Sequence, residues 1–320
     1  MEKNVLISLC MPTNGVIEWV FPVLDSIFGQ GVDDNLFEVV VTDNGDNEKF
    51  KMMMKQYVQK HSNIVYAETN ALPFLNEIES YKRANGEFIK FVNHRTLLVD
   101  GALQKLVDFV KTNRKEKPIV YFANGALKIQ KEVHYYNSFD KFVRNLSYWS
   151  SWSTGMAIWK EDFLKLPEDV EDFNELFPHT TVLFRERNRC RYIIDNTVIM
   201  DEMPQGKKPK GNYNLYWAFG IEYPGIIFDL FRDESISKTT FRYVLDTNLD
   251  FIAGMYFEYH IRKHYCSYDL NGLKDIFGVF YSKSKFWMKV IQITVKRLAK
   301  KLLNFNIPKG KICRDNKVER

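Results

Sequence analysis

"VLISLCMPTN", residues 5–14, is the stretch that decides the fold. Its first seven residues are almost all apolar, and Pro12, Thr13 and Asn14 then end the run. A short continuous apolar run closed by such residues is typical of a strand buried on both faces, as in a parallel sheet. Apolar residues at helical spacing follow over 16–28. The stretch therefore predicts the first strand and helix of an α/β domain.

The same alternation continues along the first third of the chain. Strands are expected over 37–42, 64–67 and 88–92, and helices over 49–61 and 73–84. Strands that alternate with helices predict right-handed βαβ units and a mostly parallel sheet, in which 5–11, 37–42 and 88–92 are neighbours. Further along, the patterns favour a helix-like stretch after Arg95, strands over 119–123, 126–131, 154–159 and 192–200, and a helix over 177–187.

A loop-rich stretch, "DEMPQGKKPKGNYN" at 201–214, separates this part from a region in which helical patterns dominate. We therefore expect an α/β domain over 1–205, a helical region over 206–282 and a basic amphipathic helix and tail over 283–320. The alternation of strands and helices makes the fold class α/β with flanking helices.

Composition and charge exclude several classes of protein. The net charge of +5 is too small to indicate nucleic-acid binding by itself, and 45% hydrophobic residues are typical of a globular protein. The four cysteines form no CxxC pair, which argues against a disulfide framework or zinc site and favours a reducing cytoplasm. No run approaches the ~18 apolar residues of a membrane span, and the N-terminal apolar run is too short for a signal peptide.

Polar residues follow several of the predicted strands. In parallel sheets, ligands bind at the carboxyl ends of the strands, so these residues should converge on one crevice. They are Thr13, Asn14, Asp43, Asn44, Asn70, Asn93, His94 and Arg95.

Four segments carry a resemblance to a known family: "ISLCMPTN" (7–14), "FEVVVTDNGDNE" (37–48), "TNALPFLNEIESYKRANGEFIKFV" (69–92) and "STGMAIWKEDF" (153–163). In this order, they resemble a family 2 glycosyltransferase with the GT-A fold. The resemblance covers about residues 4–200, and "FPHTTVLF" (177–184) is similar to abequosyltransferase-like enzymes of bacterial surface polysaccharides. It implies inverting transfer of a sugar, hexosyl or related, from a nucleotide sugar to a surface glycan or lipid-linked oligosaccharide.

The resemblance also implies roles for individual residues. Those matching Pro12, Thr13 and Asp43 bind the nucleoside, although Asp43 in "DNG" is also good turn chemistry. "PTNG" is one residue shorter than the family's usual motif, which affects the assignment of Asn14 to the donor. Asn70 and Asn76 match recurrent asparagines, and capping of the next helix is the alternative.

Residues Asn93, His94 and Arg95 depart from the family pattern, because they stand where it carries an Asp-x-Asp metal motif. In one interpretation the chain is an inactive relative that binds membrane and partner proteins as a scaffold. In the other, cations replace the metal: Arg95, with His94 as a second candidate, and Lys207, Lys208 and Lys210 from a loop that is otherwise a solvated linker. Arginine pairs with phosphate bidentately and is always charged. We favour a metal-independent enzyme without a cofactor; a divalent cation is the alternative.

Inverting transfer needs a general base for the acceptor hydroxyl. Alignment of the family's base-bearing helix with "LFPHTTVLFRE" puts His179 at that position, and an imidazole pKa near ~6.5 suits this role. The alternative is that His179 caps its helix while Asp172 or Glu175 is the base. Trp152 in "SYWSSWSTG" is a candidate acceptor platform, because aromatic faces pack on sugars; plain aromatic packing is the alternative.

The C-terminal segment 283–311 contains nine Lys and Arg residues and no acid. On a helix, Lys285, Lys289, Lys296 and Lys300 fall on one side, and Trp287, Ile291, Thr294, Leu298, Leu302 and Phe305 on the other. This predicts a helix lying in an anionic membrane surface, which would make the protein peripheral on the cytoplasmic face of the cell membrane. A helix docked on the protein itself is the alternative. Nucleic acid fits a helix with Trp and Leu less well.

Overall fold

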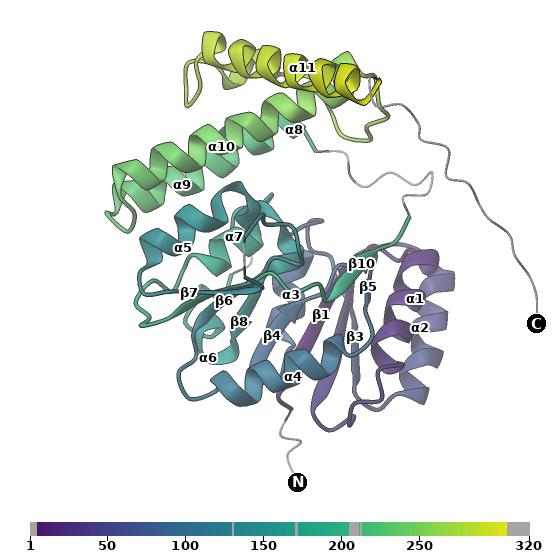
Figure 1. Ribbon diagram of the computed structural model, residues 1–320. Coiled ribbons are helices and arrows are strands. Elements are labelled where there is room, and N and C mark those ends of the chain that lie inside the picture. Colours follow the sequence, from purple (N-terminus) through teal and green to yellow (C-terminus); the bar gives the residue numbers. More distant parts are fainter. Residues whose placement is uncertain (1–4, 130, 170–171, 205–210, 212, 306–320) are drawn as a thin grey trace, which may run out of the picture.

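The computed structural model describes residues 5–129, 131–169, 172–204, 211 and 213–305, without the side chains of 300–305. It confirms the α/β class with a helical C-terminal region (Figure 1). The strands are β1 (Ile7–Thr13), β2 (Phe37–Asp43), β3 (Ile64–Glu68), β4 (Phe88–Phe91), β5 (Thr96–Leu98), β6 (Ile119–Phe122), β7 (Val133–Tyr136), β8 (Ala157–Trp159), β9 (Tyr192–Asp195) and β10 (Met200–Glu202). The α-helices are α1 (Ile17–Phe28), α2 (Glu48–Lys60), α3 (Asn76–Lys82), α4 (Ala102–Asn113), α5 (Phe139–Leu146), α6 (Lys160–Phe163), α7 (Pro178–Leu183), α8 (Leu215–Trp217), α9 (Tyr223–Arg232), α10 (Lys238–Tyr256) and α11 (Lys283–Phe305).

The main sheet has the strand order β3-β2-β1-β4-β8. Strands β1 to β4 are mutually parallel where they pair, and β8 runs antiparallel to β4. The predicted adjacency of the first, second and fourth strands is therefore confirmed. Thr13 lies opposite Asp43 in the register, so the carboxyl ends of β1 and β2 meet at one edge.

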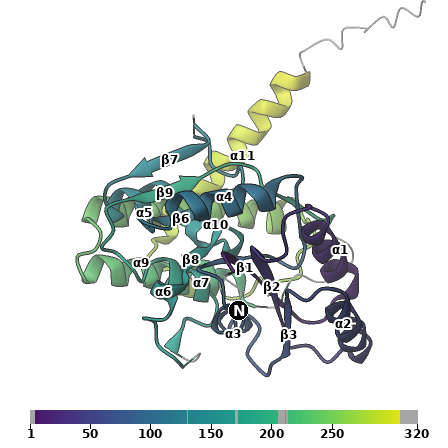
Figure 2. The ribbon, with the colours of Figure 1, turned by 90° about the horizontal axis from the view of Figure 1, so that it is seen from below.

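Strand β1 is buried on both faces, as its apolar run predicts. Leu9 and Met11 belong to a core that includes α1 and α4, whereas Cys10 points to the opposite core, which includes α3. Figure 2 shows α4 and α3 on opposite sides of β1. The main sheet is therefore covered by helices on both faces.

A smaller sheet, β6-β9-β7, extends the domain. Its core is shared with α5 and with helices of the C-terminal region, because Phe142, Tyr192, Tyr223 and Ile252 all belong to one buried cluster. In Figure 1 the helices α8 to α11 form a layer above the sheets, with α11 outermost. The helical region is thus packed on the α/β part by a common core.

Three segments differ from the sequence-based expectation. The strand expected over 126–131 is found instead at β7, because Asn196 holds both the N–H and the carbonyl of Leu127 in a loop. The strand expected over 192–200 is split into β9 and β10, since the Asp195 side chain accepts from Thr197 N–H and turns the chain. The stretch after Arg95 first forms β5, which pairs with β10, before α4 begins.

Gly155 and Gly254 provide a test of the packing. A Cβ at Gly155 would lie 2.2 Å from the Tyr121 ring, whereas one at Gly254, inside α10, would meet nothing within 4 Å. We expect Gly155→Ala to lower the free energy of unfolding by about 1–3 kcal/mol through overpacking. Gly254→Ala should raise it by about 0.5–1 kcal/mol, because alanine favours the helix. Urea unfolding followed by circular dichroism measures both, and equal midpoints would contradict the packing described here.

Candidate donor-binding and catalytic site

The carboxyl ends of β1 and β2 are joined into one rigid edge. Asp43 is 1% exposed; its Oδ1 accepts from Gly45 N–H at 2.9 Å and its Oδ2 from the Tyr66 hydroxyl at 3.2 Å. Burial raises the pKa of Asp43, while these hydrogen bonds oppose the shift. A carboxylate has further lone pairs, so a nucleoside hydroxyl or N–H can be bound if the half-buried Tyr66 moves aside.

Gly45 permits the turn that follows Asp43. A Cβ at this position would lie 2.3 Å from the backbone oxygen of Asn14. Only glycine allows the two strand-end loops to approach this closely. The exposed Asn14 is therefore held close to the turn that follows Asp43.

The side chain of Asn76 links the ends of β1 and β2 by hydrogen bonds. Its Nδ2 donates to the carbonyls of Thr13 at 3.2 Å and Thr42 at 2.9 Å, and its Oδ1 accepts from the Thr69 hydroxyl at 2.8 Å. The side chain is 1% exposed. Because its side-chain amide is hydrogen-bonded to protein groups, Asn76 in this conformation holds the strand ends in position.

His94 and Arg95 lie beside Thr13 but differ in charge. His94 Nδ1 shares a hydrogen bond of 2.9 Å with Thr13 Oγ1. Burial and the neighbouring Arg95 cation lower the pKa of His94 to about 3, so this imidazole is neutral at pH 7. The Arg95 guanidinium lies over the Trp19 ring, 5.4 Å from the ring centre, and this cation–π contact supports it on one side. Of the residues 93–95, Arg95 alone carries positive charge.

The donor groups at 93–95 do not suit a divalent metal. Asn93 Oδ1 accepts from the Arg95 backbone N–H at 3.1 Å, and His94 is bonded to Thr13. Magnesium and manganese prefer carboxylate oxygens, and a fixed guanidinium repels a cation beside it. Among the described residues, no three His, Cys, Asp or Glu side chains are placed to hold a metal ion together.

His179, at the start of α7, is 5% exposed. Its Nε2 lies 2.9 Å from the Ser151 carbonyl, and its Nδ1 lies 3.5 Å from Glu77 Oε2. Glu77 is itself buried and accepts from the Tyr81 hydroxyl at 2.7 Å. Both ring nitrogens therefore face protein groups, and an acceptor hydroxyl can reach the imidazole only if the ring or the segment around Ser151 moves. Glu77, which the sequence did not single out, is placed to stabilise an imidazolium.

The remaining predicted residues occupy different settings. Trp152 is half-buried against Trp149, with ring centres 6.1 Å apart, and its carbonyl accepts from the Tyr121 hydroxyl at 2.8 Å. Asn70 is exposed beyond β3, whereas Pro12 lies within β1 opposite Thr42. The alternative bases Asp172 and Glu175 are both exposed. Lys207, Lys208 and Lys210 lie outside the described residues.

Direct contacts link several of the predicted residues. His94 is bonded to Thr13, Thr13 to Asn76, and the next residue, Glu77, faces His179. Ser151, the other partner of His179, precedes Trp152. These contacts therefore link residues from five separate segments of the sequence.

The C-terminal region also reaches this edge. Tyr213 packs against Tyr268 with ring centres 4.7 Å apart and against Phe74, after β3, at 5.5 Å. Burial raises the pKa of Tyr268, and the nearby Arg95 guanidinium opposes that shift. No local pattern identifies Tyr213 or Tyr268, since the rings in contact are distant in the sequence: 55 residues separate Tyr213 from Tyr268, and 139 separate Phe74 from Tyr213.

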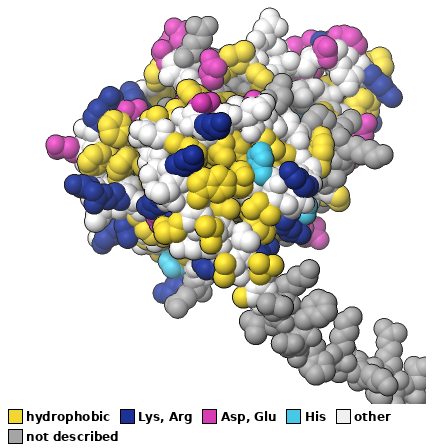
Figure 3. All heavy atoms as spheres, turned by 90° about the horizontal axis from the view of Figure 1, so that it is seen from above, with side chains coloured by type: hydrophobic (Ala, Val, Ile, Leu, Met, Phe, Trp, Pro, Cys, Tyr) yellow, Lys and Arg dark blue, Asp and Glu magenta, His cyan; other side chains and the backbone are white. Residues whose placement is uncertain are grey.

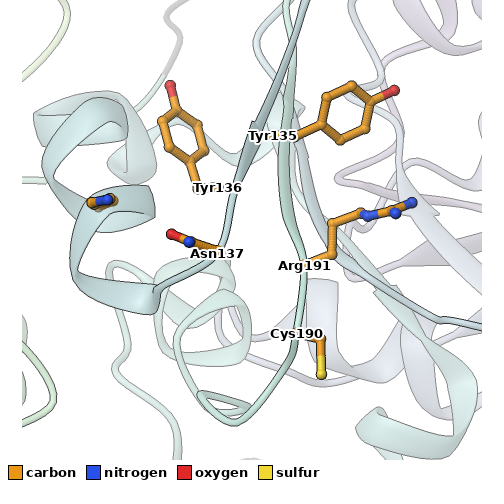
Figure 4. Close-up of a pocket in the computed structure, with 6 residues that line it drawn as sticks. Tyr135, Tyr136, Asn137, Cys190 and Arg191 are labelled. Carbon is orange, nitrogen blue, oxygen red and sulfur yellow. The ribbon is translucent and has the colours of Figure 1, made fainter.

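A separate hollow of about 410 Å³ lies elsewhere; it is lined by Tyr135, Tyr136, Asn137, Lys141, Cys190 and Arg191. Figure 4 shows Tyr135 and Arg191 on one side of the strands, and Tyr136 and Asn137 on the other. Arg191 directly precedes Tyr192, the first residue of β9, so it lies at the amino end of that strand. Strand β6 runs parallel to β9. This hollow is therefore not part of the carboxyl-end site.

Comparisons with known proteins agree with a glycosyltransferase of the GT-A type. No family model matches the sequence. The chain is similar to the minor teichoic acid biosynthesis protein GgaB of Bacillus subtilis (strain 168), with 26% identity over 125 residues, 37% of this chain and 14% of that protein. It is also similar to the uncharacterized glycosyltransferase MG025 homolog of Mycoplasma pneumoniae, with 24% identity over 109 residues, 33% of this chain and 36% of that protein.

Among solved structures, the chain is similar to S. aureus TarS 1-349 in complex with UDP-GlcNAc, at 15% identity and a TM-score of 0.54. That match covers 80% of this chain and 73% of the other. The structure of S. aureus TarS matches with a TM-score of 0.53 and 14% identity, over 80% of this chain and 44% of TarS. At this identity the likeness shows the GT-A fold. The chain covers only a minor part of either curated relative.

Asp43 provides a test of the site. Its pKa is raised in the folded state, so its contribution to stability is greatest at low pH and falls as pH rises through the folded pKa. Asp43→Asn should therefore gain stability relative to the wild type between pH 4 and pH 7. The same variant should bind nucleotide about tenfold to a hundredfold more weakly, because a hydrogen bond to a charged group is lost. Urea unfolding at both pH values and calorimetry measure these effects; unchanged affinity would remove Asp43 from the donor site.

Proposed function

We propose that the chain transfers a sugar from a nucleotide-sugar donor to a bacterial surface glycan or lipid-linked oligosaccharide, with inversion. The observation that carries the proposal is the joined edge at Thr13 and Asp43, at the carboxyl ends of parallel strands in a GT-A fold. Ligands bind at such edges in open α/β sheets. A uridine diphosphate sugar is the first donor to test, because the TarS structure is a complex with UDP-GlcNAc. The similarity to GgaB supports a teichoic-acid-type polymer as acceptor.

In this proposal, Arg95 supplies the positive charge that a metal ion would otherwise provide. Arg95 lies in the turn between β4 and β5, where the donor's diphosphate is expected, and His94 contributes no charge at pH 7. As the bond between sugar and phosphate breaks, a fixed cation that donates two hydrogen bonds stabilises the leaving diphosphate. Lys207 and Lys208 are further candidates for this role from the sequence alone.

His179 is proposed to accept the proton from the acceptor hydroxyl. When the segment around Ser151 moves, Nε2 loses its carbonyl partner and becomes the nitrogen that can accept the proton, while Nδ1 faces Glu77. Glu77 Oε2, 3.5 Å from Nδ1, would then stabilise the imidazolium. Since the ring is buried, this role requires the Ser151–Trp152 segment to open when acceptor binds, which makes Trp152 part of the acceptor wall.

A second candidate function is a non-catalytic relative that binds partners at a membrane. It is favoured by the missing acids at 93–95 and by the burial of His179. The nucleoside-side residues Thr13 and Asp43 favour the enzyme.

The proposed location is the cytoplasmic face of the cell membrane, where a lipid-linked acceptor would be found. No helix in the described part of the chain is long and apolar enough to span a bilayer. We propose that the protein is peripheral there, because the basic amphipathic segment 283–311 fits an anionic membrane surface.

A nucleotide panel separates the two functions. Calorimetry with uridine, guanosine, cytidine and thymidine diphosphates and their sugars should show binding of one nucleotide family. Arg95→Ala should weaken that binding only modestly if its main effect is on the transition state. Absence of binding to every nucleotide would contradict the glycosyltransferase proposal and leave the non-catalytic relative.

Arg95 and metal dependence are tested by turnover. Activity should persist in EDTA, and Arg95→Ala should lower kcat about a hundredfold or more, since one preorganised contact to developing charge is lost. Arg232→Ala, an exposed arginine on α9, is the matched control and should keep full activity. Loss of activity in EDTA with recovery in manganese would show that other acids hold a metal.

A further inference from the structure

Helix α11 is docked on the protein along one face. Phe286 is fully buried and Val290 is 4% exposed, both in the core shared with α10. Tyr256, at the end of α10, packs against Phe286 at 5.5 Å and against Trp287 at 5.2 Å between ring centres. Trp287 was expected on a lipid-facing side; it contacts the protein instead.

Ion pairs also hold this face of α11 on the protein. Lys289 is only 6% exposed, and its Nζ lies 2.8 Å from Asp250 and 3.2 Å from Asp246. Lys285 also pairs with Asp246, at 2.7 Å, and Arg297 pairs with Glu258 at 3.2 Å. The expectation that Lys285 and Lys289 meet the membrane is thus corrected, because acids of α10 neutralise them.

The opposite face of α11 carries a second apolar row, which we call the outward stripe. It consists of Met288, Ile291, Val295 and Leu298, which are 50%, 62%, 58% and 57% exposed. Spacings of three, four and three residues place these side chains on one side of a helix. Figure 3 shows apolar side chains gathered on this face of the molecule, with Lys and Arg side chains around them.

We propose that the outward stripe of α11 inserts into the headgroup region of an anionic bilayer. This rests on the proposed membrane location and names the surface responsible. Lys283 and Lys296 are exposed on the same helix, and the sequence 283–311 contains no acid. An apolar row with basic residues around it matches a surface of acyl chains and anionic headgroups.

Charge argues against a second copy of the chain as the occupant. Two outward stripes packed face to face would bring Lys283 and Lys296 of both copies together, and like charges repel. A bilayer with anionic lipid offers apolar contact and opposite charge at once. Because α11 is held on α10 by buried contacts, its insertion would also set the orientation of the whole molecule above the membrane.

The test is co-sedimentation of the full chain with vesicles of phosphatidylcholine alone or with phosphatidylglycerol. The wild type should pellet with the anionic vesicles. Ile291→Glu combined with Leu298→Glu should lower the partition coefficient about tenfold or more, since apolar contact is lost and negative charge added. Leu164→Glu, at another exposed leucine (69% exposed), is the control and should bind like the wild type. Nucleotide affinity without vesicles should be equal in all three proteins, which shows that the variants are folded.

Three results would overturn the inference. The first is equal pelleting of the wild type and the double variant, and the second is no pelleting of the wild type. The third is a wild type that forms dimers without lipid while the double variant is monomeric, which would make the stripe a contact between copies. Failure of the glycosyltransferase proposal is seen separately, as absence of nucleotide binding in solution.

Discussion

The amide of Asn76 holds together the part of the structure on which the proposed function depends. One nitrogen donates to the carbonyls of Thr13 and Thr42, which belong to neighbouring strands, and the oxygen accepts from Thr69 beyond the third strand. The Thr13 carbonyl also accepts from the backbone N–H of Asn44 at 3.1 Å, so Asn76 adds a second hydrogen bond there. A single buried side chain thus bridges the two strand ends and fixes the spacing of the loops that carry Asn14 and Asp43.

The same segment couples the proposed donor edge to the proposed acceptor side. Glu77 follows Asn76 on α3 and faces His179, which is bonded to the carbonyl of Ser151 beside Trp152. A shift of α3 would therefore move both the strand ends and the imidazole. Rearrangement on binding is physically reasonable here, because Asp43 and His179 are both nearly buried and each needs a neighbour to move before a ligand can touch it.

The replacement of acids by Asn93, His94 and Arg95 changes the electrostatics of the strand end. A metal site would need carboxylates, which repel a diphosphate until the cation arrives. Here the positive charge belongs to the side chain of Arg95, whose guanidinium lies over the Trp19 ring. His94 is kept neutral by burial and by Arg95, so residues 93–95 provide one fixed cation and an imidazole that is hydrogen-bonded to Thr13.

The sequence by itself determined the strand and helix order of the first hundred residues, because a continuous apolar run and helical spacing are local signals. It also indicated Thr13, Asp43, His94 and Arg95 as neighbours, since carboxyl ends of parallel strands share one edge. Tertiary structure decided what depends on distant partners. The split of 192–200 into β9 and β10 follows from the turn at Asp195 and from pairing with β5. The faces of α11 depend on Asp246, Asp250 and Tyr256, which lie on a different helix, so periodicity alone could predict an amphipathic helix but not which of its two apolar rows is covered by protein.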